Sequence, residues 1–370
     1  MEPIPFLSLG PQHTLIHKDV MEALKKGFEK NWFILGEALG KFEEEYATFS
    51  NVGYCLGVGS GYDALSIALR ACAVGSGDEV IVPAHTYIAT WLAVSKTGAK
   101  IVPVEPSRST FTIDVNKVGN YITPKTKAIL PVHLYGQSCD MSVLEDIAKR
   151  HQLLIIEDNA QAHGASWNGK MTGSFGHINA TSFYPTKNLG CLGDGGAITT
   201  DHEELVRFVK QYRNYGFESK NFCEVQGVNS RLDELQASVL SIKLKHLMQW
   251  NEQRREIASK FLKLLKGVGD LQLPFSPTEA YHVYHLFVIR SAHRDKLREH
   301  LASFHVETMV HYPLPPHLQK AYASLGYKKG AFPITEEIAN SALSLPLWPG
   351  MKDEQVQYIC DLIIKFYSSR

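Results

Sequence analysis

Short apolar runs alternate with amphipathic stretches between residues 54 and 200, and this alternation limits the fold more than any other feature of the chain. Amphipathic helices are expected at 62–72, 86–97 and 141–151. Strands that alternate with helices are typical of a mostly parallel sheet covered on both faces. We therefore predict an α/β fold around such a sheet. Its strands are expected at 55–58, 79–83, 100–105, 128–132, 153–158, 180–184 and 196–199.

The 370 residues exceed what one hydrophobic core usually organises, because single cores stop growing at about 250–300 residues. Beyond Pro274 and Pro277 the pattern changes to a strand at 281–290 and a helix at 294–304. We predict a large domain over residues 1–250 and a smaller α+β domain over residues 251–370. The large domain is expected to include an extended arm at 1–10 and helices at 19–30 and 40–50. A long helix at 232–264, either straight or kinked, is expected to lead out of it.

Charge and composition exclude several classes of partner. Lys and Arg together number 38, as do Asp and Glu, so the formal charge is zero, which argues against nucleic acid or an anionic membrane as partner. No apolar run is long enough to span a bilayer, and the first ten residues lack the basic segment of a secretion signal. The six cysteines lack C-x-x-C spacing, and the histidines are isolated. We expect a cytoplasmic protein without a bound metal.

Lys187 is the first candidate for chemistry. It follows an apolar, aromatic run that ends at Pro185, and the glycines at 190, 193, 195 and 196 then allow a tight turn. A lysine held between a strand and such a turn can lose solvent, which lowers its pKa and makes the amine a nucleophile for a Schiff base. A solvated loop lysine is the alternative, and other stretches of the chain must decide between the two.

A buried strand is expected to end in two carboxylates, Glu157 and Asp158. Burying a carboxylate is costly unless a cation meets it, and a protonated pyridine nitrogen is such a cation. Asp158 would then keep the ring nitrogen of pyridoxal phosphate (PLP) protonated, although a carboxylate that caps the next turn explains the position equally well. Gln161 and His163 follow on the same loop and could reach the ring hydroxyl or the substrate.

The segment 57–65 places several glycines at a helix start, where backbone N–H groups suit a phosphate. Tyr62 stands where a dinucleotide fingerprint needs its third glycine, and no G-K-[ST] follows, so both nucleotide motifs fail. Ser182 could donate its hydroxyl to the same phosphate. Tyr87, just past another strand end, could stack on a planar cofactor, although most aromatic residues in such places belong to the core.

Several long segments, in the same order along nearly the whole chain, resemble the DegT/DnrJ/EryC1/StrS family of sugar nucleotide aminotransferases. This resemblance implies the fold-type I architecture, as in aspartate aminotransferase, with PLP as cofactor. The residues His85, Asn159 and Trp348 depart from the family pattern, and these differences bear on specificity more than on chemistry. The segments that carry the resemblance are 32–36, 122–137, 157–164, 182–190, 227–237 and 344–350.

The resemblance also implies a role for each candidate. Lys187 would hold PLP as a Schiff base and Asp158 would pair with the pyridinium. Asn229 would reach the phosphate from the neighbouring subunit, which implies a homodimer with shared active sites. The remaining cofactor contacts would be Tyr87 on the ring, Gln161 near the 3′-hydroxyl, and Ser182 with the backbone of Gly61 and Tyr62 at the phosphate.

By the same resemblance, L-glutamate donates the amino group and a nucleotide-linked keto sugar accepts it. The closest branch aminates C3 of dTDP-3-keto-6-deoxyhexoses and gives 3-amino-3,6-dideoxy sugars, while amination at C4 of a 4-keto sugar is the alternative. Two other functions stay open. A PLP-dependent sugar dehydratase would have histidine in place of Lys187, and a regulatory member would bind without turnover. The candidates for binding the sugar nucleotide are Tyr184, Lys220, His311 and Tyr312. A lysine suits a diphosphate and aromatic rings suit a hexose, although an ordinary surface or core position explains each of these residues equally well.

Overall fold

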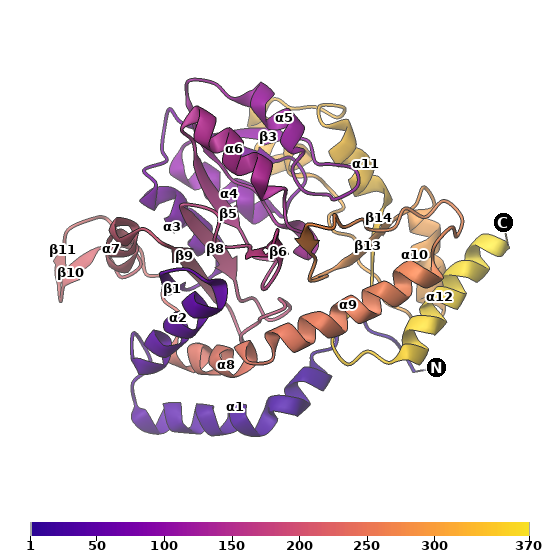
Figure 1. Ribbon diagram of the computed structural model, residues 1–370, viewed down its shortest axis with the longest axis horizontal. Helices are drawn as coiled ribbons and strands as arrows, with labels where there is room; N and C mark the ends of the chain where they lie inside the picture. Colours follow the sequence, from indigo (N-terminus) through magenta and orange to yellow (C-terminus); the bar gives the residue numbers. More distant parts are fainter. Residues whose placement is uncertain (1, 370) are drawn as a thin grey trace.

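A seven-stranded sheet forms the centre of the computed structural model, which describes residues 2–369 (Figure 1). Its strand order is β1-β9-β8-β5-β4-β2-β3, and every neighbouring pair is parallel except those that involve β9. All seven predicted strands are present, and the prediction of a mostly parallel sheet is confirmed. The strands are β1 (Tyr54–Val58), β2 (Glu79–Pro83), β3 (Lys100–Val104), β4 (Thr126–Ile129), β5 (Leu154–Asp158), β8 (Ile178–Ser182) and β9 (Gly196–Thr200).

Successive residues of each strand enter different cores, as the alternation of side chains along a strand requires. Val80 and Val82 pack with Trp91 on one face, whereas Ile81 packs with Ile147 on the other. The first face is covered by α3 (Gly61–Ala71), α4 (Ile88–Thr97) and α7 (Glu203–Tyr212). The second is covered by α5 (Val115–Val118) and α6 (Met141–His151), and near β1 and β9 by α2 (Glu37–Ser50) and α8 (Glu234–Leu244).

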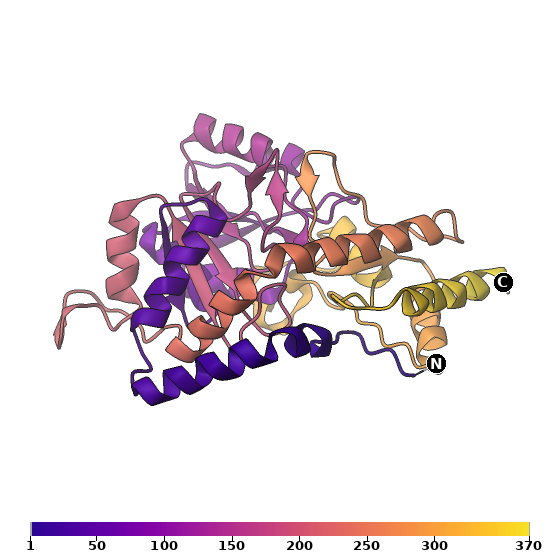
Figure 2. The same ribbon diagram turned by 60° about the horizontal axis from the view of Figure 1, so that its bottom comes forward.

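A smaller lobe lies at one end of the molecule, beside both ends of the described chain (Figures 1 and 2). Its antiparallel pair β13 (Phe287–Arg290) and β14 (Ala342–Leu345) packs in a separate core that includes Phe261, Leu301 and Ile359. The helices around this core are α9 (Leu247–Leu264), α10 (Arg294–Ser303) and α12 (Asp353–Ser368), and α11 (Pro333–Ser341) joins it to the sheet. We keep the boundary near residue 250 as a proposal, since α9 connects the two lobes (Figure 2).

The remaining elements are peripheral. Helix α1 (Gly10–Lys30) packs along α8. Three short strands form a small sheet, β6 (Ser166–Trp167), β7 (Lys170–Met171) and β12 (Ala280–Tyr281), and β10 (Phe217–Ser219) and β11 (Phe222–Cys223) form a hairpin. Short 3₁₀ turns occur at Gly119–Tyr121, Leu134–Gly136, Pro316–Leu318 and Lys320–Leu325.

The predicted long helix 232–264, for which a kink was one of the expectations, is two helices. The chain bends at Lys245 and His246, so that α8 follows the large lobe and α9 reaches the small one (Figure 2). Two other expectations about single elements were wrong. Helix α1 starts at Gly10 rather than at 19, with Pro11 in its first turn, where its missing N–H costs nothing. The predicted strand 281–290 is interrupted, because residues 282–286 pair with the turn at 135–136 instead.

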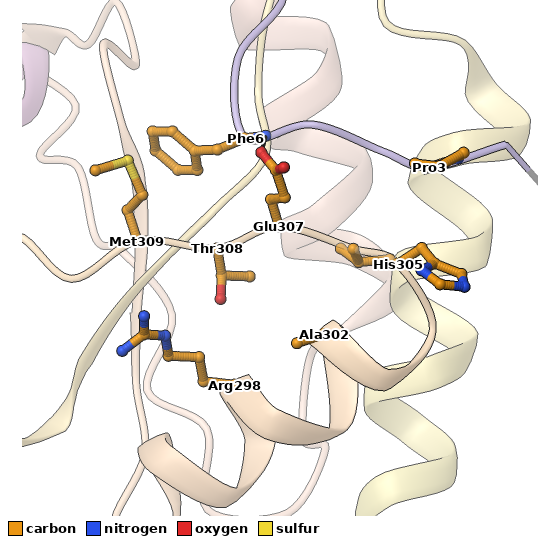
Figure 3. Close-up of a pocket in the computed structure, with 9 residues that line it drawn as sticks. Pro3, Phe6, Arg298, Ala302, His305, Glu307, Thr308 and Met309 are labelled. Atoms are coloured by element: carbon orange, nitrogen blue, oxygen red, sulfur yellow. Dashed lines mark hydrogen bonds between the residues drawn. The ribbon is translucent and has the colours of Figure 1, made fainter.

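The N-terminal arm packs on the small lobe. Ile4 is fully buried, donates its N–H to the carbonyl of His305 at 2.9 Å and accepts from the N–H of Glu307 at 3.0 Å. The carboxylate of Glu307 in turn accepts the N–H of Phe6 at 3.0 Å. Arm and lobe together border a hollow of about 440 Å³ that Arg298 also lines (Figure 3), and this hollow contains none of the predicted site residues.

Candidate active site

A pocket of about 460 Å³ lies at the carboxyl ends of the parallel strands, where ligands settle in open α/β sheets. The segments that follow β1, β2, β5 and β8 form its floor and walls, and the small lobe closes one side. The pocket brings together ten of the predicted site residues. These are Gly61, Tyr62, Tyr87, Asp158, Gln161, Ser182, Tyr184, Lys187 and, from the small lobe, His311 and Tyr312.

The loop that carries Lys187 is fixed on both sides of the lysine. The N–H of Lys187 donates to the carbonyl of Tyr184 at 2.8 Å. The next side chain, Asn188, is buried and donates to Oδ1 of Asn251 at 2.9 Å and to the carbonyl of Val283 at 3.1 Å. These bonds tie the loop to α9 and to the interrupted segment before β13, and so hold the lysine over the pocket.

The glycine at 190 is required by this loop, because a Cβ there would lie 2.4 Å from the carbonyl oxygen of Pro185. The amine of Lys187 is half-buried in the pocket. Loss of solvent lowers the pKa of Lys187 to about 8, against the opposing effect of the Asp158 carboxylate. A substantial fraction of this amine is therefore unprotonated near neutral pH, as a nucleophile requires.

Asp158 is only 5% exposed at the end of β5. Its Oδ2 accepts the hydroxyl of Thr90 at 2.9 Å, and its Oδ1 accepts the N–H of Ala160 at 3.2 Å. Burial raises the pKa of Asp158, and these two hydrogen bonds, with Lys187, oppose the rise. Within residues 2–369 the carboxylate has no cation in ion-pair contact, so it fits a ligand that carries a protonated nitrogen.

A close approach of three segments forms a cradle at one end of the pocket. Helix α3 starts at Gly61 with Ser60 as its N-cap, whose hydroxyl accepts the N–H of Asp63 at 3.1 Å. A Cβ at Gly61 would lie 2.5 Å from Cβ of Ser182, and one at Gly196 would lie 2.4 Å from the carbonyl oxygen of Ser60. The first N–H groups of a helix have no intrahelical partner, so this cradle suits a phosphate group.

Comparison with known proteins identifies the family of this chain. The sequence pattern of the DegT/DnrJ/EryC1/StrS aminotransferase family matches residues 14–364. The chain belongs to this family. Membership confirms the resemblance inferred from the sequence, the fold-type I architecture, the aminotransferase class and PLP as the cofactor. The amine, the unpaired carboxylate and the phosphate cradle around one pocket fit that cofactor.

Three relatives illustrate the family. The chain is 47% identical to a dTDP-3-amino-3,6-dideoxy-alpha-D-galactopyranose transaminase of Aneurinibacillus thermoaerophilus, over 98% of this chain and 99% of the relative. It is 46% identical to a protein of Geobacillus stearothermophilus named pleiotropic regulatory protein, over 98% of both chains. The crystal structure of S. venezuelae DesV in complex with a ketimine intermediate superposes with a TM-score of 0.97, at 44% identity over 99% of both chains.

Two of the predicted site residues lie away from the pocket of this chain. Lys220 is exposed at the tip of the β10–β11 hairpin, which projects from the body of the molecule (Figure 1). Asn229 is exposed and forms an isolated bridge with Asn214. In one chain neither residue lines the pocket, so their predicted roles depend on a second subunit.

His163 also lies outside the pocket lining, although it follows Gln161 on the same loop. Its ring is fully buried, and Nε2 lies 2.9 Å from the carbonyl oxygen of Ser182. Burial lowers the pKa of His163 to about 3, so the ring is neutral and supports the strand behind the cradle. In this position His163 does not line the pocket, so it is not placed to reach a ring hydroxyl or the substrate as the sequence suggested.

Sequence reasoning missed several residues of the family site. His285 and Leu286 line the pocket because the segment 282–286 pairs with the 135–136 turn rather than continuing a strand. Asp194, in the glycine-rich turn after Lys187, also lines the pocket. Thr90, in α4, donates a hydrogen bond to Asp158. None of these stands directly after a predicted strand, so the strand-end rule did not select them. Within residues 2–369 no helix is long and apolar enough to cross a membrane, and no group of three or more metal-ligating side chains gathers.

Proposed function

We propose that this protein transfers the amino group of L-glutamate to C3 of a dTDP-3-keto-6-deoxyhexose, giving a dTDP-3-amino-3,6-dideoxyhexose. The observation that carries the proposal is the convergence of Lys187, Asp158 and the cradle at Gly61 and Ser182 on one pocket. The 47% identity to a transaminase named for a dTDP-3-amino-3,6-dideoxy sugar supports the choice of C3. We further propose that the protein acts in the cytoplasm.

Lys187 carries the proton transfers in this proposal. PLP, when bound, supplies an aldehyde carbon that accepts the amino group and a ring that delocalises an electron pair. The Nζ atom of Lys187 removes the proton from Cα of glutamate, and in the second half of the reaction it delivers a proton to C3 of the sugar. A pKa of about 8 suits an amine that must both take and give a proton near neutral pH.

The other residues hold and polarise the cofactor. Asp158, which is only 5% exposed, would accept a hydrogen bond from the ring nitrogen and keep it protonated, and its burial in a medium of low dielectric constant would strengthen that interaction. The hydroxyl of Ser182 and the N–H groups of Gly61 and Tyr62 would bind the phosphate at the positive end of α3. Tyr87 would stack on the ring, and the Gln161 amide would contact the 3′-hydroxyl.

On the substrate side, Tyr184, His311 and Tyr312 border the open part of the pocket. Burial, and secondarily Lys187, lowers the pKa of His311 to about 4, so this ring is neutral at physiological pH and acts through hydrogen bonds. Its Nδ1 lies 2.8 Å from the hydroxyl of Ser344. We propose that these three residues contact the hexose and the adjoining phosphate oxygens.

The charge of the pocket supports a homodimer. Its lining contains one amine, Lys187, and two carboxylates, Asp158 and Asp194, whereas glutamate and the dTDP group are both anions. An anion needs a counter-charge in a site of low dielectric constant. We propose that Lys220 and Asn229 of the partner subunit complete the site, carried there by the projecting hairpin.

Exposed aromatic residues agree with this assembly. Phe28 and Phe222 are each 70% exposed and Trp32 is 63% exposed. Large apolar side chains that remain open to water in clusters mark surfaces that another chain covers. Phe222 lies on the same hairpin as Lys220, so one contact between subunits would bury the aromatic ring and deliver the lysine.

The test is a reaction panel. The purified protein is incubated with PLP, L-glutamate and either dTDP-3-keto-6-deoxyhexoses or dTDP-4-keto-6-deoxyhexoses, and the products are identified by mass and NMR. The proposal expects a nitrogen on C3 and one 2-oxoglutarate for each amino sugar. A nitrogen on C4 would establish the alternative within the class and overturn the assignment to C3.

A regulatory role is a second candidate, because one relative of 46% identity is named as a regulatory protein. A protein that binds a nucleotide sugar without turnover has no need of an amine with a lowered pKa beside an unpaired buried carboxylate. Cofactor absorbance distinguishes the two roles. A yellow protein whose colour bleaches when glutamate is added is an aminotransferase, whereas a yellow protein that does not respond favours the regulatory role.

A further inference from the structure

The hydroxyl of Tyr135 joins the two lobes beside the pocket. This hydroxyl donates to the backbone carbonyl of His311 in the small lobe, and Nε2 of His85 lies 2.8 Å from the hydroxyl oxygen of Tyr135. Since the hydroxyl hydrogen is directed to His311, His85 must be the donor to the hydroxyl. Burial lowers the pKa of His85 to about 3, which leaves a neutral ring whose single N–H is on Nε2.

The backbone of Tyr135 makes a second connection. Its N–H donates to Oε1 of Gln161 at 2.8 Å, and Nε2 of Gln161 donates to the hydroxyl of Tyr312 at 2.9 Å. An amide whose oxygen accepts an N–H is fixed in one of its two orientations. Tyr135 thereby fixes how Gln161 presents its donor, and holds both residues of the His311–Tyr312 pair from one position.

The backbone conformation of Tyr135 is strained. Tyr135 has a φ of +60°, in the left-handed region that a residue with a large side chain rarely adopts. Its side chain and that of His85 are each only 2% exposed. The carbonyl of Tyr135 also accepts the N–H of Leu286 at 3.3 Å, so the turn is bonded to the small lobe on both sides.

Hydrogen bonds and ring contacts hold the segment that contains His311 and Tyr312. The ring of Tyr312 lies 5.5 Å from that of Tyr87, centroid to centroid. On its small-lobe side it pairs with β14 through Met309 and Ser344, and Nδ1 of His311 lies 2.8 Å from the Ser344 hydroxyl. Beyond Tyr312, Pro313 and Leu314 are exposed. Within residues 2–369, the hydrogen bonds from the large lobe to this pair come from Tyr135 and Gln161.

We propose that His85 and Tyr135 are positioning residues that set the affinity for the sugar nucleotide by fixing the His311–Tyr312 pair over the pocket. The proposal rests on the function proposed above, in which that pair contacts the sugar nucleotide. In this proposal His85 acts through the Tyr135 hydroxyl and does not line the pocket. Its ring also lies 6.3 Å from that of Tyr312, centroid to centroid, and a leucine at position 85 would keep an apolar side chain beside that ring. A residue at position 85 that cannot donate to this hydroxyl would leave the pair less constrained, so position 85 contributes to specificity from behind the pocket.

The test is Tyr135→Phe in the holoenzyme, which removes the hydroxyl and keeps the backbone bond to Gln161. Tyr322→Phe is the matched control, because Tyr322 is also buried and its hydroxyl lies 3.2 Å from that of Ser95, outside the pocket lining. The first measurement is hydrogen exchange without substrate, in peptides that cover residues 307–314. The second is the KM for the keto sugar and the Kd for dTDP.

We expect about tenfold faster exchange in that segment for Tyr135→Phe and wild-type exchange for Tyr322→Phe. The KM and the dTDP Kd should rise about tenfold, with kcat within about threefold, because tenfold corresponds to the loss of about 1.4 kcal/mol of binding. His85→Leu should act in the same direction. The KM and the dTDP Kd of the double variant should not exceed those of Tyr135→Phe alone, because both substitutions break the same chain of hydrogen bonds from His85 through Tyr135 to His311.

Wild-type exchange in the segment, or an unchanged KM and Kd in Tyr135→Phe, would overturn the inference. So would additive effects of the two substitutions. The wild-type protein in the same assay separates this result from the proposed function. If the wild type does not aminate the sugar, the proposed function is wrong. If the wild type is active and Tyr135→Phe has the same exchange, KM and Kd as the wild type, only the positioning role is wrong.

Discussion

The hydroxyl of Thr90, in the first turn of α4, donates a 2.9 Å hydrogen bond to Oδ2 of Asp158 at the end of β5. Thr90 is fully buried, so this bond stabilises the ionised carboxylate where solvent cannot. It opposes the effect of burial, which raises the pKa of Asp158. The state of the carboxylate that must hold the ring nitrogen therefore depends on a residue that does not line the pocket.

We expect Thr90→Val to weaken cofactor binding and turnover. Valine has nearly the same shape but no donor, and a hydrogen bond to a charged group contributes about 1.5–3 kcal/mol, or about 10–100-fold. The measurement is the Kd for PLP from its absorbance, together with kcat. Thr97→Val on the same helix is the control, because its hydroxyl bonds only to the carbonyl of Val94 and the N–H of Ala99. Equal losses in both variants would contradict the role of Thr90.

Lys187→Ala should abolish the covalent attachment of PLP. The protein should lack the absorbance of the bound Schiff base, should not yield a cofactor-labelled peptide after borohydride reduction, and should lose at least about 10²–10⁴-fold in turnover through loss of the proton carrier alone. Lys245→Ala, at the bend between α8 and α9, is a lysine control that should retain the label. Normal turnover in Lys187→Ala would end the mechanism proposed above.

Glu157 should matter for stability rather than for binding. Its fully buried carboxylate lies 2.7 Å from Nε2 of His133 and accepts the N–H groups of Gly173, Phe175 and Gly176 at 2.7–2.8 Å. Glu157→Gln places a donor against these donors and removes a charge that they surround. We expect the free energy of unfolding to fall by about 3 kcal/mol, the scale of a broken buried network.

Denaturation in urea measures this loss. The control is Glu145→Gln, whose carboxylate forms an exposed pair with Lys170 at 3.4 Å and should change stability by no more than about 0.5 kcal/mol. A fall of similar size in the two variants would show that the network around Glu157 is not what stabilises this strand end.

The sequence predicted the sheet well because its strands are buried on both faces. Continuous apolar runs such as 153–156 leave little choice of structure, and the segments at the carboxyl ends of the predicted strands contain Asp158, Ser182 and Lys187. The strand-end rule needs only the order of elements along the chain. The residues on the cofactor side of the pocket could therefore be predicted from the sequence.

The residues on the small-lobe side of the pocket could not be predicted in the same way. Residues 282–286 read as part of a strand, but their partners are the backbone groups of Tyr135 and Gly136, which lie about 150 residues earlier in the chain. Pairing at such a distance leaves no local pattern. A Cβ at Gly136 would lie 2.8 Å from the N–H of His285, so the close approach is visible only in three dimensions. Tyr135 and His285 were missed for this reason.

Lys243 provides the last prediction, because it is a buried lysine that supports the catalytic loop. It is 4% exposed on α8, and its Nζ donates to the carbonyl of Gly190 at 2.6 Å. Burial lowers the pKa of Lys243 to about 8. An unfolded chain keeps the ordinary lysine pKa, near 10.5, so between pH 8 and 10.5 the unfolded state binds more protons and stability rises with pH.

Lys243→Met keeps the apolar stem and removes the amine. In the holoenzyme, where Lys187 is already linked to PLP, we expect this variant to lose the rise in stability between pH 8 and 10.5, a difference on the order of 3 kcal/mol across that interval. Melting temperature as a function of pH measures it, with Lys245→Met as the control. A variant that keeps the wild-type slope would show that Lys243 is protonated alike in the folded and unfolded protein, and that its bond to Gly190 is made by an ammonium group.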